Sequence, residues 1–361
     1  MRRRTFLQTL SGASLRGLRA SAAPIRLGYD TYSIRGFRWK SVQLLDYAAS
    51  LKLDTIQLSS LGDYESLEPS HLEKVKEQAQ RLGLSIDGGI GCICPTSASW
   101  SPKQGDPVQY VLLGLRVARA VGATVMRCFL GSGEDRRGTL PIAAHMEATV
   151  KVLRSVRAQA LDAGVKIALE NHAGDLQARE VKTIIQEAGK DFVGACLDSG
   201  NSIWAVEDPL VTLEVLGPYV VTTHYRDAVV YEHPRGAAGQ WVALGDGSID
   251  LAGLVARHRE LCPQAAMQLE IITGRPSQIL PYLEPGFWKI FPGTPAAEFV
   301  RFAALARNGH PFMGSMMIAG PGKQPPEFQA ALKEQQRRDL ERSLEYAKKT
   351  LDVGIRWRAQ P

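Results

Sequence analysis

The sequence predicts one (β/α)₈ barrel with a helical extension at its carboxyl end. Short apolar runs, typical of buried parallel strands, alternate eight times with helix patterns, and this alternation favours a parallel sheet that closes on itself. Four of these runs, from residue 166 onward, also end in a residue type that binds metals. The chain has 361 residues, 45% hydrophobic and 22% charged, which is ample for one large core.

The eight strands are predicted from runs rich in Val, Ile, Leu and Ala that lead into polar or small residues. In chain order they cover residues 25–29, 55–58, 84–87, 124–129, 166–169, 193–197, 220–223 and 266–269. Helices are predicted over residues 41–51, 70–82, 107–120, 143–163, 179–187, 209–216, 251–261 and 296–306. Gly122 and Gly164 lie just past two of these helices, where glycine accepts the left-handed conformation that ends a helix.

Beyond the barrel, residues 309–326 are rich in Gly, Pro and Met and are expected to be irregular. A helix is predicted over residues 328–351. Its mixed charges favour packing on the barrel or a homo-oligomer contact over membrane binding. The predicted division is therefore a leader over 1–22, a barrel over 24–310 and an extension over 311–361.

The amino terminus has the features of an export signal. Residues 1–22 contain five Arg and no acidic residue, Arg3 and Arg4 open a twin-arginine pattern, and Ala20, Ser21 and Ala22 form a small-residue motif for cleavage. We therefore expect export to the periplasm by the twin-arginine route; the alternative is a basic tail on a cytoplasmic protein. No later apolar stretch reaches the roughly 18 residues of a membrane helix, so stable membrane insertion is not expected.

Charge argues against a nucleic-acid-binding protein, and cysteine content argues against a disulfide-rich one. Without residues 1–22, 38 basic and 37 acidic residues remain, so the body has no overall basic field for nucleic acid. The five Cys are an odd number, and several fall in or beside predicted strands. They are expected to be buried free thiols and not a disulfide framework.

Four residues at the ends of consecutive predicted strands form a candidate metal site: Glu170, Asp198, His224 and Glu270. The carboxyl ends of barrel strands meet at one mouth, so these side chains can point to one position. Three carboxylates and one imidazole suit a divalent ion, with Mn²⁺ expected first and Mg²⁺, Co²⁺ or Zn²⁺ as alternatives.

The segments around these residues resemble the xylose isomerase-like TIM-barrel superfamily, and within it the sugar (phosphate) isomerase/epimerase branch that includes tagatose 3-epimerase and inosose dehydratase. The resemblance covers roughly residues 24–310 and rests on ALENHAGD, CLDSGN followed by EDP, THYRD, LGDGSIDL and QLEI. It implies that Glu170, Asp198, His224 and Glu270 are the metal ligands. It also implies that Glu170 and Glu270 are the catalytic acid/base pair.

Three positions depart from the pattern of that branch. A substrate-contacting His is common three residues after the metal Asp, where this chain has Asn201, which cannot relay a proton near neutral pH. Val230 stands where an Arg is expected six residues after the metal His, and Gln57 stands where a Glu is common. The substrate pocket is therefore expected to differ from that of the ketohexose epimerases.

Other polar or aromatic residues near the predicted strand ends are candidates for substrate binding, each with a structural alternative. His172 would face the same side as Glu170, Asp227 would orient a ligand or cap a turn, and Trp204 would stack on a sugar or pack under its loop. Arg226 and Arg275 would bind an anionic sugar group. With Asn201, these residues complete the predicted substrate-binding set.

The predicted function is a divalent-metal-dependent carbohydrate isomerase or epimerase that acts on a small sugar through an enediolate. The alternative is a lyase or dehydratase acting on a keto-sugar, an inosose or a 3-keto-glycoside, because one site supports all these reactions. An apurinic endonuclease would need a basic groove, and a non-catalytic sugar-binding barrel would not need two opposed glutamates.

Overall fold

The computed structural model describes residues 24–320 and 322–358. The predicted leader over residues 1–22 lies outside this range, so the export prediction is not tested by the fold. Within the range, no helix combines the length and the apolar character needed to cross a membrane. All five Cys are buried and free, as predicted.

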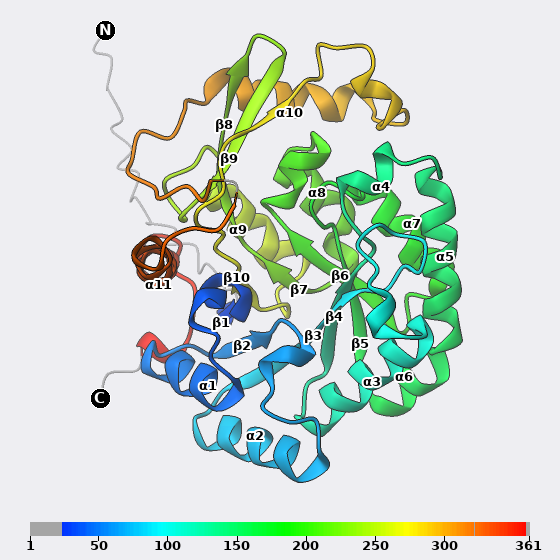
Figure 1. The fold of residues 1–361 in the computed structure, drawn as a ribbon, viewed down its shortest axis with the longest axis vertical. Coiled ribbons are helices and arrows are strands. Elements are labelled where there is room, and N and C mark those ends of the chain that lie inside the picture. Colours follow the sequence, from blue (N-terminus) through cyan, green and yellow to red (C-terminus); the bar gives the residue numbers. More distant parts are fainter. Residues whose placement is uncertain (1–23, 321, 359–361) are drawn as a thin grey trace, which may run out of the picture.

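A parallel eight-stranded sheet forms the centre of the molecule and confirms the predicted barrel (Figure 1). Its strand order is β10-β1-β2-β3-β4-β5-β6-β7. A parallel bridge between Tyr225 and Leu269 joins the two ends of this order, with Tyr225 N donating to Gln268 O at 2.7 Å. The strands are β1 (Leu27–Asp30), β2 (Thr55–Leu58), β3 (Ser85–Cys92), β4 (Val125–Phe129), β5 (Lys166–Glu170), β6 (Val193–Asp198), β7 (Val220–His224) and β10 (Met267–Leu269).

Most of the helices lie close to the predicted positions, and all but α10 surround this sheet; α10 packs on a second sheet described below. They are α1 (Ser41–Ser50), α2 (Pro69–Arg81), α3 (Pro107–Ala120), α4 (Gly133–Arg137), α5 (Ile142–Ser155), α6 (Arg157–Ala163), α7 (Ala178–Ala188), α8 (Pro209–Leu216), α9 (Leu251–Leu261) and α10 (Ala296–Asn308). Gly122 and Gly164 have φ of 76° and 65°, as expected of glycines that end helices.

The single helix predicted over residues 143–163 is wrong, because the chain breaks it into α5 and α6 at Val156. The φ of Val156 is −109°, outside the helical range but comfortable for a β-branched residue, and its side chain is fully buried. The short helix α4 was also not predicted. Asp135 in α4 accepts hydrogen bonds from Ser97 and from the backbone of Ala98, so this helix is fixed by contacts distant in sequence.

A second, three-stranded antiparallel sheet was missed by the sequence analysis. It has the order β11-β9-β8 and comprises β8 (Asp227–His233), β9 (Gly236–Val242) and β11 (Gln278–Leu280). It follows directly on β7 and lies beside α10 at one side of the barrel (Figure 1). This sheet carries Trp241 to the mouth of the barrel, where that side chain lines a cavity.

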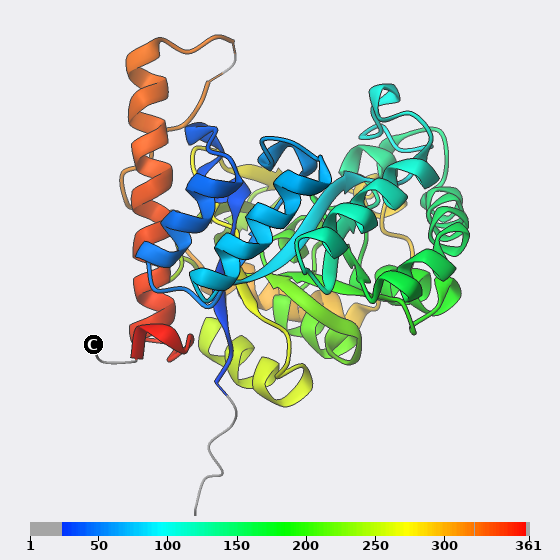
Figure 2. The ribbon, with the colours of Figure 1, turned by 90° about the horizontal axis from the view of Figure 1, so that it is seen from below.

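The predicted carboxyl-terminal helix is present as α11 (Pro326–Lys349), which stands along the barrel beside α1 (Figure 2). It packs against the 3₁₀ segment η1 (Thr31–Phe37), and Gln336 Oε1 accepts a hydrogen bond from Gly36 N at 2.9 Å. Leu340 and Leu344 are fully buried at this contact face. The helix therefore packs on its own barrel, one of the two arrangements that its sequence favours.

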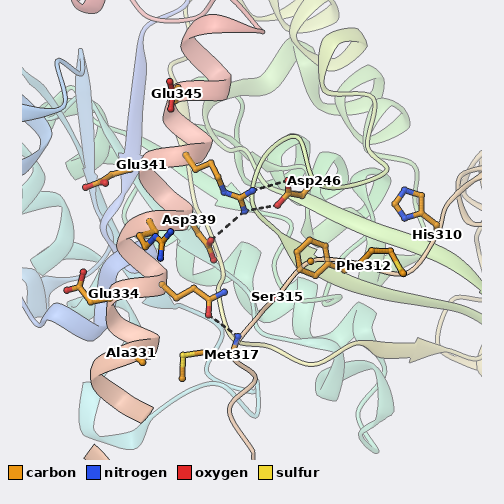
Figure 3. A pocket seen from close by; sticks show the side chains of 15 residues that line it. Asp246, His310, Phe312, Ser315, Met317, Ala331, Glu334, Asp339, Glu341 and Glu345 are labelled. Carbon is orange, nitrogen blue, oxygen red and sulfur yellow. Dashed lines mark hydrogen bonds and ion pairs between the residues drawn. The ribbon is translucent and has the colours of Figure 1, made fainter. Parts of the chain in front are cut away.

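An open cavity of about 1120 Å³ lies between α11 and residues 310–317 (Figure 3). Arg342 on α11 pairs with Asp246 across one side of it at 2.6 Å, and Gln335 accepts a hydrogen bond from Met317 N at 2.9 Å. None of its lining residues lines the cavity at the barrel mouth. It is therefore separate from the candidate site described next.

Candidate metal centre and active site

Four buried side chains converge where the barrel strands end. Glu170, Asp198 and His224 are the last residues of β5, β6 and β7, and Glu270 directly follows β10. Each offers a ligand atom, and the four atoms all lie within 4.8 Å of one another. The structure therefore brings together the four residues that the sequence analysis chose as metal ligands.

The orientation of His224 leaves one imidazole nitrogen free for a ligand. Its Nε2 lies 3.0 Å from Gln57 Oε1 on β2, so Nε2 can carry the proton and donate it to the amide oxygen. Its Nδ1 then faces the carboxylates, 2.8 Å from Glu270 Oε2 and 3.4 Å from Glu170 Oε1. Gln57, which departs from the family pattern, thus fixes the ring that carries the candidate nitrogen ligand.

Two buried atoms in this cluster remain able to bind a metal ion. Asp198 Oδ2 and His224 Nδ1 make no well-aligned hydrogen bond within the described residues, and their nearest charged neighbours are Arg226 at 2.9 Å and Glu270 at 2.8 Å. Buried polar atoms usually make hydrogen bonds, so both atoms can accept a further ligand. Three carboxylates and one imidazole are a donor set that divalent ions accept. The residues present therefore fit a divalent cation.

Two buried guanidinium groups balance the carboxylates. Arg127, from β4, pairs with Glu170 through Nε, and Arg226 pairs with Glu270 and lies 2.9 Å from Asp198 Oδ2. Arg226 also stacks on Trp241, with its Cζ 5.0 Å from the ring centre. Arg226 was chosen from the sequence, whereas Arg127 was missed. The one signal for Arg127 was a lone cation inside the apolar run of β4.

These charges set the ionisation of the two glutamates. Burial alone would raise the pKa of Glu270, but the charge of Arg226 and the ring of His224 hold it well below the usual range. Burial opposes ionisation of Glu170 in the same way, and Arg127 with His224 lowers its pKa well below the usual range. Burial raises the pKa of Asp198 to about 6, so the three carboxyl groups are not equivalent.

Asn201 and His172 both line the mouth cavity next to the cluster. Asn201 Nδ2 donates to Glu170 Oε1 at 3.0 Å, and its backbone N donates to Asp198 Oδ1 at 2.7 Å. His172 is stacked on Phe129, with ring centres 3.9 Å apart, and its Nδ1 lies 2.6 Å from Gly131 O. The position at which the resemblance implies a substrate-contacting His is thus occupied here by an amide that hydrogen-bonds to Glu170.

Of the remaining three candidates, one lies at the mouth cavity and two make packing or turn contacts. Arg275 lines the mouth cavity and is exposed. Trp204 lines a neighbouring cavity and packs edge-on against Trp241 at 5.0 Å, which is the packing alternative considered from the sequence. Asp227 accepts hydrogen bonds from the backbone N of Gly245 and Gly247, both at 3.0 Å. The contacts of Asp227 are therefore those of a turn cap and not of a substrate ligand.

The mouth cavity has a volume of about 350 Å³, suited to a small polar molecule. It combines aromatic side chains, three guanidinium groups and one of the glutamates. Its lining residues are Tyr32, Ser59, Arg127, Phe129, His172, Ala173, Asn201, Arg226, Trp241, Glu270, Ile272 and Arg275.

Comparisons with known proteins agree with this architecture. The 3-oxo-isoapionate decarboxylase of Pectobacterium atrosepticum is 22% identical over 241 residues, which are 63% of this chain and 78% of the decarboxylase. A crystal structure of D-psicose 3-epimerase in the presence of D-fructose superposes with a TM-score of 0.58 at 14% identity, covering 91% of this chain and 99% of that chain.

A xylose isomerase-like TIM barrel protein from Mycobacterium smegmatis, in complex with magnesium, superposes with a TM-score of 0.54 at 14% identity, over 79% of this chain and 97% of that chain. The sequence model of the family described as "Xylose isomerase-like TIM barrel" matches residues 45–274, which include all four converging side chains. The chain belongs to the xylose isomerase-like TIM-barrel family.

Proposed function

We propose that the protein is a divalent-metal-dependent carbohydrate isomerase or epimerase that acts through an enediolate. The observation that carries this proposal is the pair Glu170 and Glu270, two ionised glutamates that flank the same cluster. They leave strands β5 and β10, which are separated by β6 and β7 around the barrel. Each can therefore approach a substrate carbon from its own side.

A divalent cation held by Glu170, Asp198, His224 and Glu270 would supply the positive charge that stabilises the enediolate oxygens. Mn²⁺ is the ion we propose first, and Mg²⁺, Co²⁺ and Zn²⁺ suit the same donors. The M. smegmatis relative that binds magnesium supports a divalent site in this fold.

The residues of the chain perform the proton transfers. A carboxylate of Glu170 or Glu270 removes the proton from the carbon next to the carbonyl. In an epimerisation its partner first takes up a proton from water or a substrate hydroxyl and returns that proton to the opposite face, and the first glutamate then loses its proton to solvent. Arg127 and Arg226 keep both glutamates ionised, so that they are ready to act as bases at neutral pH. Such acid/base assistance contributes roughly 10²–10⁴-fold in rate.

A lyase on a keto-sugar acid or keto-glycoside is the second candidate. Asn201 cannot relay a proton, and a relative at 22% identity is a decarboxylase of a 3-oxo sugar acid. Loss of carbon dioxide next to a carbonyl, or expulsion of a β-substituent, passes through the same enolate-type charge. The same cluster therefore supports this reaction, and the fate of the substrate carbon distinguishes it from epimerisation.

Incubation in D₂O tests the proposal. The metal-loaded protein is mixed with a panel of ketoses, inososes, 3-keto-glycosides and 3-oxo sugar acids, and NMR follows deuterium at each carbon. We expect exchange at the carbon next to a carbonyl, with epimer or isomer formation for the first candidate and release of a fragment for the second. Absence of exchange and of product over the whole panel would contradict both.

Export to the periplasm remains a further proposal, supported by the twin-arginine pattern at Arg3 and Arg4. Mass spectrometry of protein from its native host would show a chain that begins near residue 23. An intact amino terminus in the cytoplasmic fraction would refute export.

A further inference from the structure

Two arginines at the barrel mouth have no acidic partner within the described residues. The guanidinium of Arg275 lines the mouth cavity and makes no side-chain hydrogen bond or ion pair there. The guanidinium of Arg35, on η1, bonds only to carbonyl oxygens: to Tyr32 O at 3.1 Å and to Thr273 O at 3.3 Å. Its Cζ lies 4.5 Å from the centre of the Tyr32 ring.

These two groups differ from the deeper arginines of the same mouth. Arg127 and Arg226 are buried and paired with Glu170 and Glu270, so their charges are already compensated. Arg35 is only partly exposed, and its charge lacks such a partner. Burial lowers the pKa of Arg35; Tyr32 and the charge of Glu270 oppose this effect, whereas the positive charges of Arg275 and Arg226 add to it. An anion between the two would relieve both effects.

The position of this pair relative to the metal-ligand cluster suits a single substrate. Arg275 shares its cavity with Glu270 and Asn201. Arg35 lines an adjoining cavity of about 250 Å³, and Tyr32 and Ser59 line both cavities. One small molecule can therefore place a carbonyl carbon at the glutamates and a charged end toward Arg275 and Arg35.

The carboxyl-terminal helix α11 holds both segments that carry these arginines. Gln336 bonds to Gly36, next to Arg35, and Asp339 Oδ2 accepts a hydrogen bond from Thr273 Oγ1 at 2.8 Å, two residues before Arg275. Both α11 side chains are buried. Because fixed cationic groups bind anions with a smaller loss of side-chain entropy, this support favours a built anion site over two mobile surface arginines.

We propose that Arg275 and Arg35 bind an anionic oxygen group of the substrate, a carboxylate or a phosphate, so that the natural substrate is a charged sugar derivative. The proposal rests on the proposed function of the same site. Guanidinium groups match both anions through paired N–H donors. Neutral hexoses would leave the two charges uncompensated and would bind weakly.

Isothermal titration of the metal-loaded protein with three matched sugars tests this inference. The probes are D-fructose, its C6 carboxylate D-fructuronate, and D-fructose 6-phosphate. At least one anion should bind at least about tenfold more tightly than fructose, since hydrogen bonds between charged groups contribute at that level. The stronger of the two anions identifies whether the site takes a carboxylate or a phosphate.

Arg275→Ala should weaken binding of the preferred anion about 10–100-fold and weaken fructose binding much less. Arg35→Gln should act in the same direction, and Arg35→Lys should restore part of the affinity because it keeps the charge. Arg81→Ala is the matched control, because Arg81 is an exposed arginine in the last turn of α2, at the opposite end of the barrel. Equal binding of all three sugars, no binding of either anion, or no effect of Arg275→Ala would overturn the inference.

Deuterium exchange into the same sugars separates this inference from the proposed function. Anion binding that depends on Arg275 but occurs without exchange at any carbon would support the anion site and contradict the enediolate chemistry. Exchange that proceeds equally with neutral and charged sugars, and is unchanged in Arg275→Ala, would support the chemistry and overturn the anion site.

Discussion

Two polar layers cross the interior of this barrel, and they differ in charge although both are buried. The deeper layer contains Thr222, Gln268 and Thr55, which stand two residues before His224, Glu270 and Gln57 on the same strands. Side chains two residues apart on a strand share a face, so the second set forms the layer nearer the mouth.

The deeper layer is built almost entirely from neutral groups. Asp87 Oδ2 accepts hydrogen bonds from Thr222 Oγ1 at 2.8 Å and from Gln268 Nε2 at 3.2 Å, and burial raises the pKa of Asp87. The layer at the mouth instead holds three carboxylates, two guanidinium groups and an imidazole. The barrel can thus bury polar groups at little electrostatic cost, and the charge at the mouth indicates function.

The largest change is expected in turnover, and it should distinguish Glu170 and Glu270 from buried carboxyl groups outside the cluster. Glu170→Gln and Glu270→Gln should each lower turnover by roughly 10²–10⁴-fold, because the amide nearly preserves shape but cannot take a proton. Steady-state kinetics with the metal content measured in parallel would show this. Glu207→Gln is the matched control, since Glu207 is buried beside the first residue of α7, outside the cluster.

Near-normal turnover in both glutamate variants, with metal still bound, would show that other residues move the proton. The acid/base assignment would then be wrong even if the metal site were correct.

Asp198 is expected to bind the metal and to take no part in proton transfer. Asp198→Ala should weaken metal binding by more than roughly 100-fold, the upper range expected when only a hydrogen bond supporting a metal ligand is lost. Gln57→Leu removes the hydrogen bond that supports His224, so metal binding should weaken by roughly 10–100-fold. Metal titration by calorimetry measures both, and excess metal should partly restore turnover in Asp198→Ala. Equal effects of the two changes would argue against Asp198 as a ligand.

A substitution in the deeper layer should lower stability and leave metal binding and turnover nearly unchanged. Asp87→Ala removes the acceptor of two buried hydrogen bonds, so the free energy of unfolding should fall by about 2–4 kcal/mol. Metal affinity and turnover should stay within a few-fold of the parent. Denaturant unfolding, together with metal titration, would test the contrast; a large loss of metal binding with unchanged stability would reverse the roles of the two layers.

The last prediction concerns the pH dependence of stability. Burial raises the pKa of Glu207 to about 8, so the folded state holds a proton that the unfolded chain releases near pH 4.5. Stability supplied by this group is therefore present below about pH 4.5 and is lost as the pH rises toward 8, by up to about 1.4 kcal/mol per pH unit.

Glu207→Gln cannot titrate, so the difference in unfolding free energy between variant and parent should move in favour of the variant from pH 5 to pH 8. Urea unfolding at several pH values measures this difference. A difference that stays constant over that range would show that Glu207 is ionised in the folded protein.

The sequence revealed the barrel because strand runs and helix ends carry local signals. Helices α3, α8 and α9 begin and end where predicted, with a Pro at the first position of α3 and α8. The hairpin of β8 and β9 gave no such signal, since GAAGQWV is poor in β-branched residues and β8 follows β7 almost without a loop. The break at Val156 also depends on packing and not on a helix-breaking residue.

The candidate metal ligands could be predicted from the sequence, but the residues that hydrogen-bond or pair with them could not. Glu170, Asp198, His224 and Glu270 each end a strand, and strand ends meet at one mouth. The contact of His224 with Gln57 crosses the barrel, and its existence depends on the stagger of strands that are distant in sequence. The pairing of Arg127 with Glu170 likewise depends on the register of β4 and β5.

Anomalous diffraction from crystals grown with Mn²⁺ would show whether the four converging side chains bind a divalent ion. We expect one strong peak per chain between Glu170, Asp198, His224 and Glu270, with ligand atoms about 2.0–2.3 Å from the ion. His224 should bind through Nδ1 while Nε2 stays bonded to Gln57. Manganese bound elsewhere, with these four side chains paired only to protein groups in an enzyme that turns over, would refute the metal site.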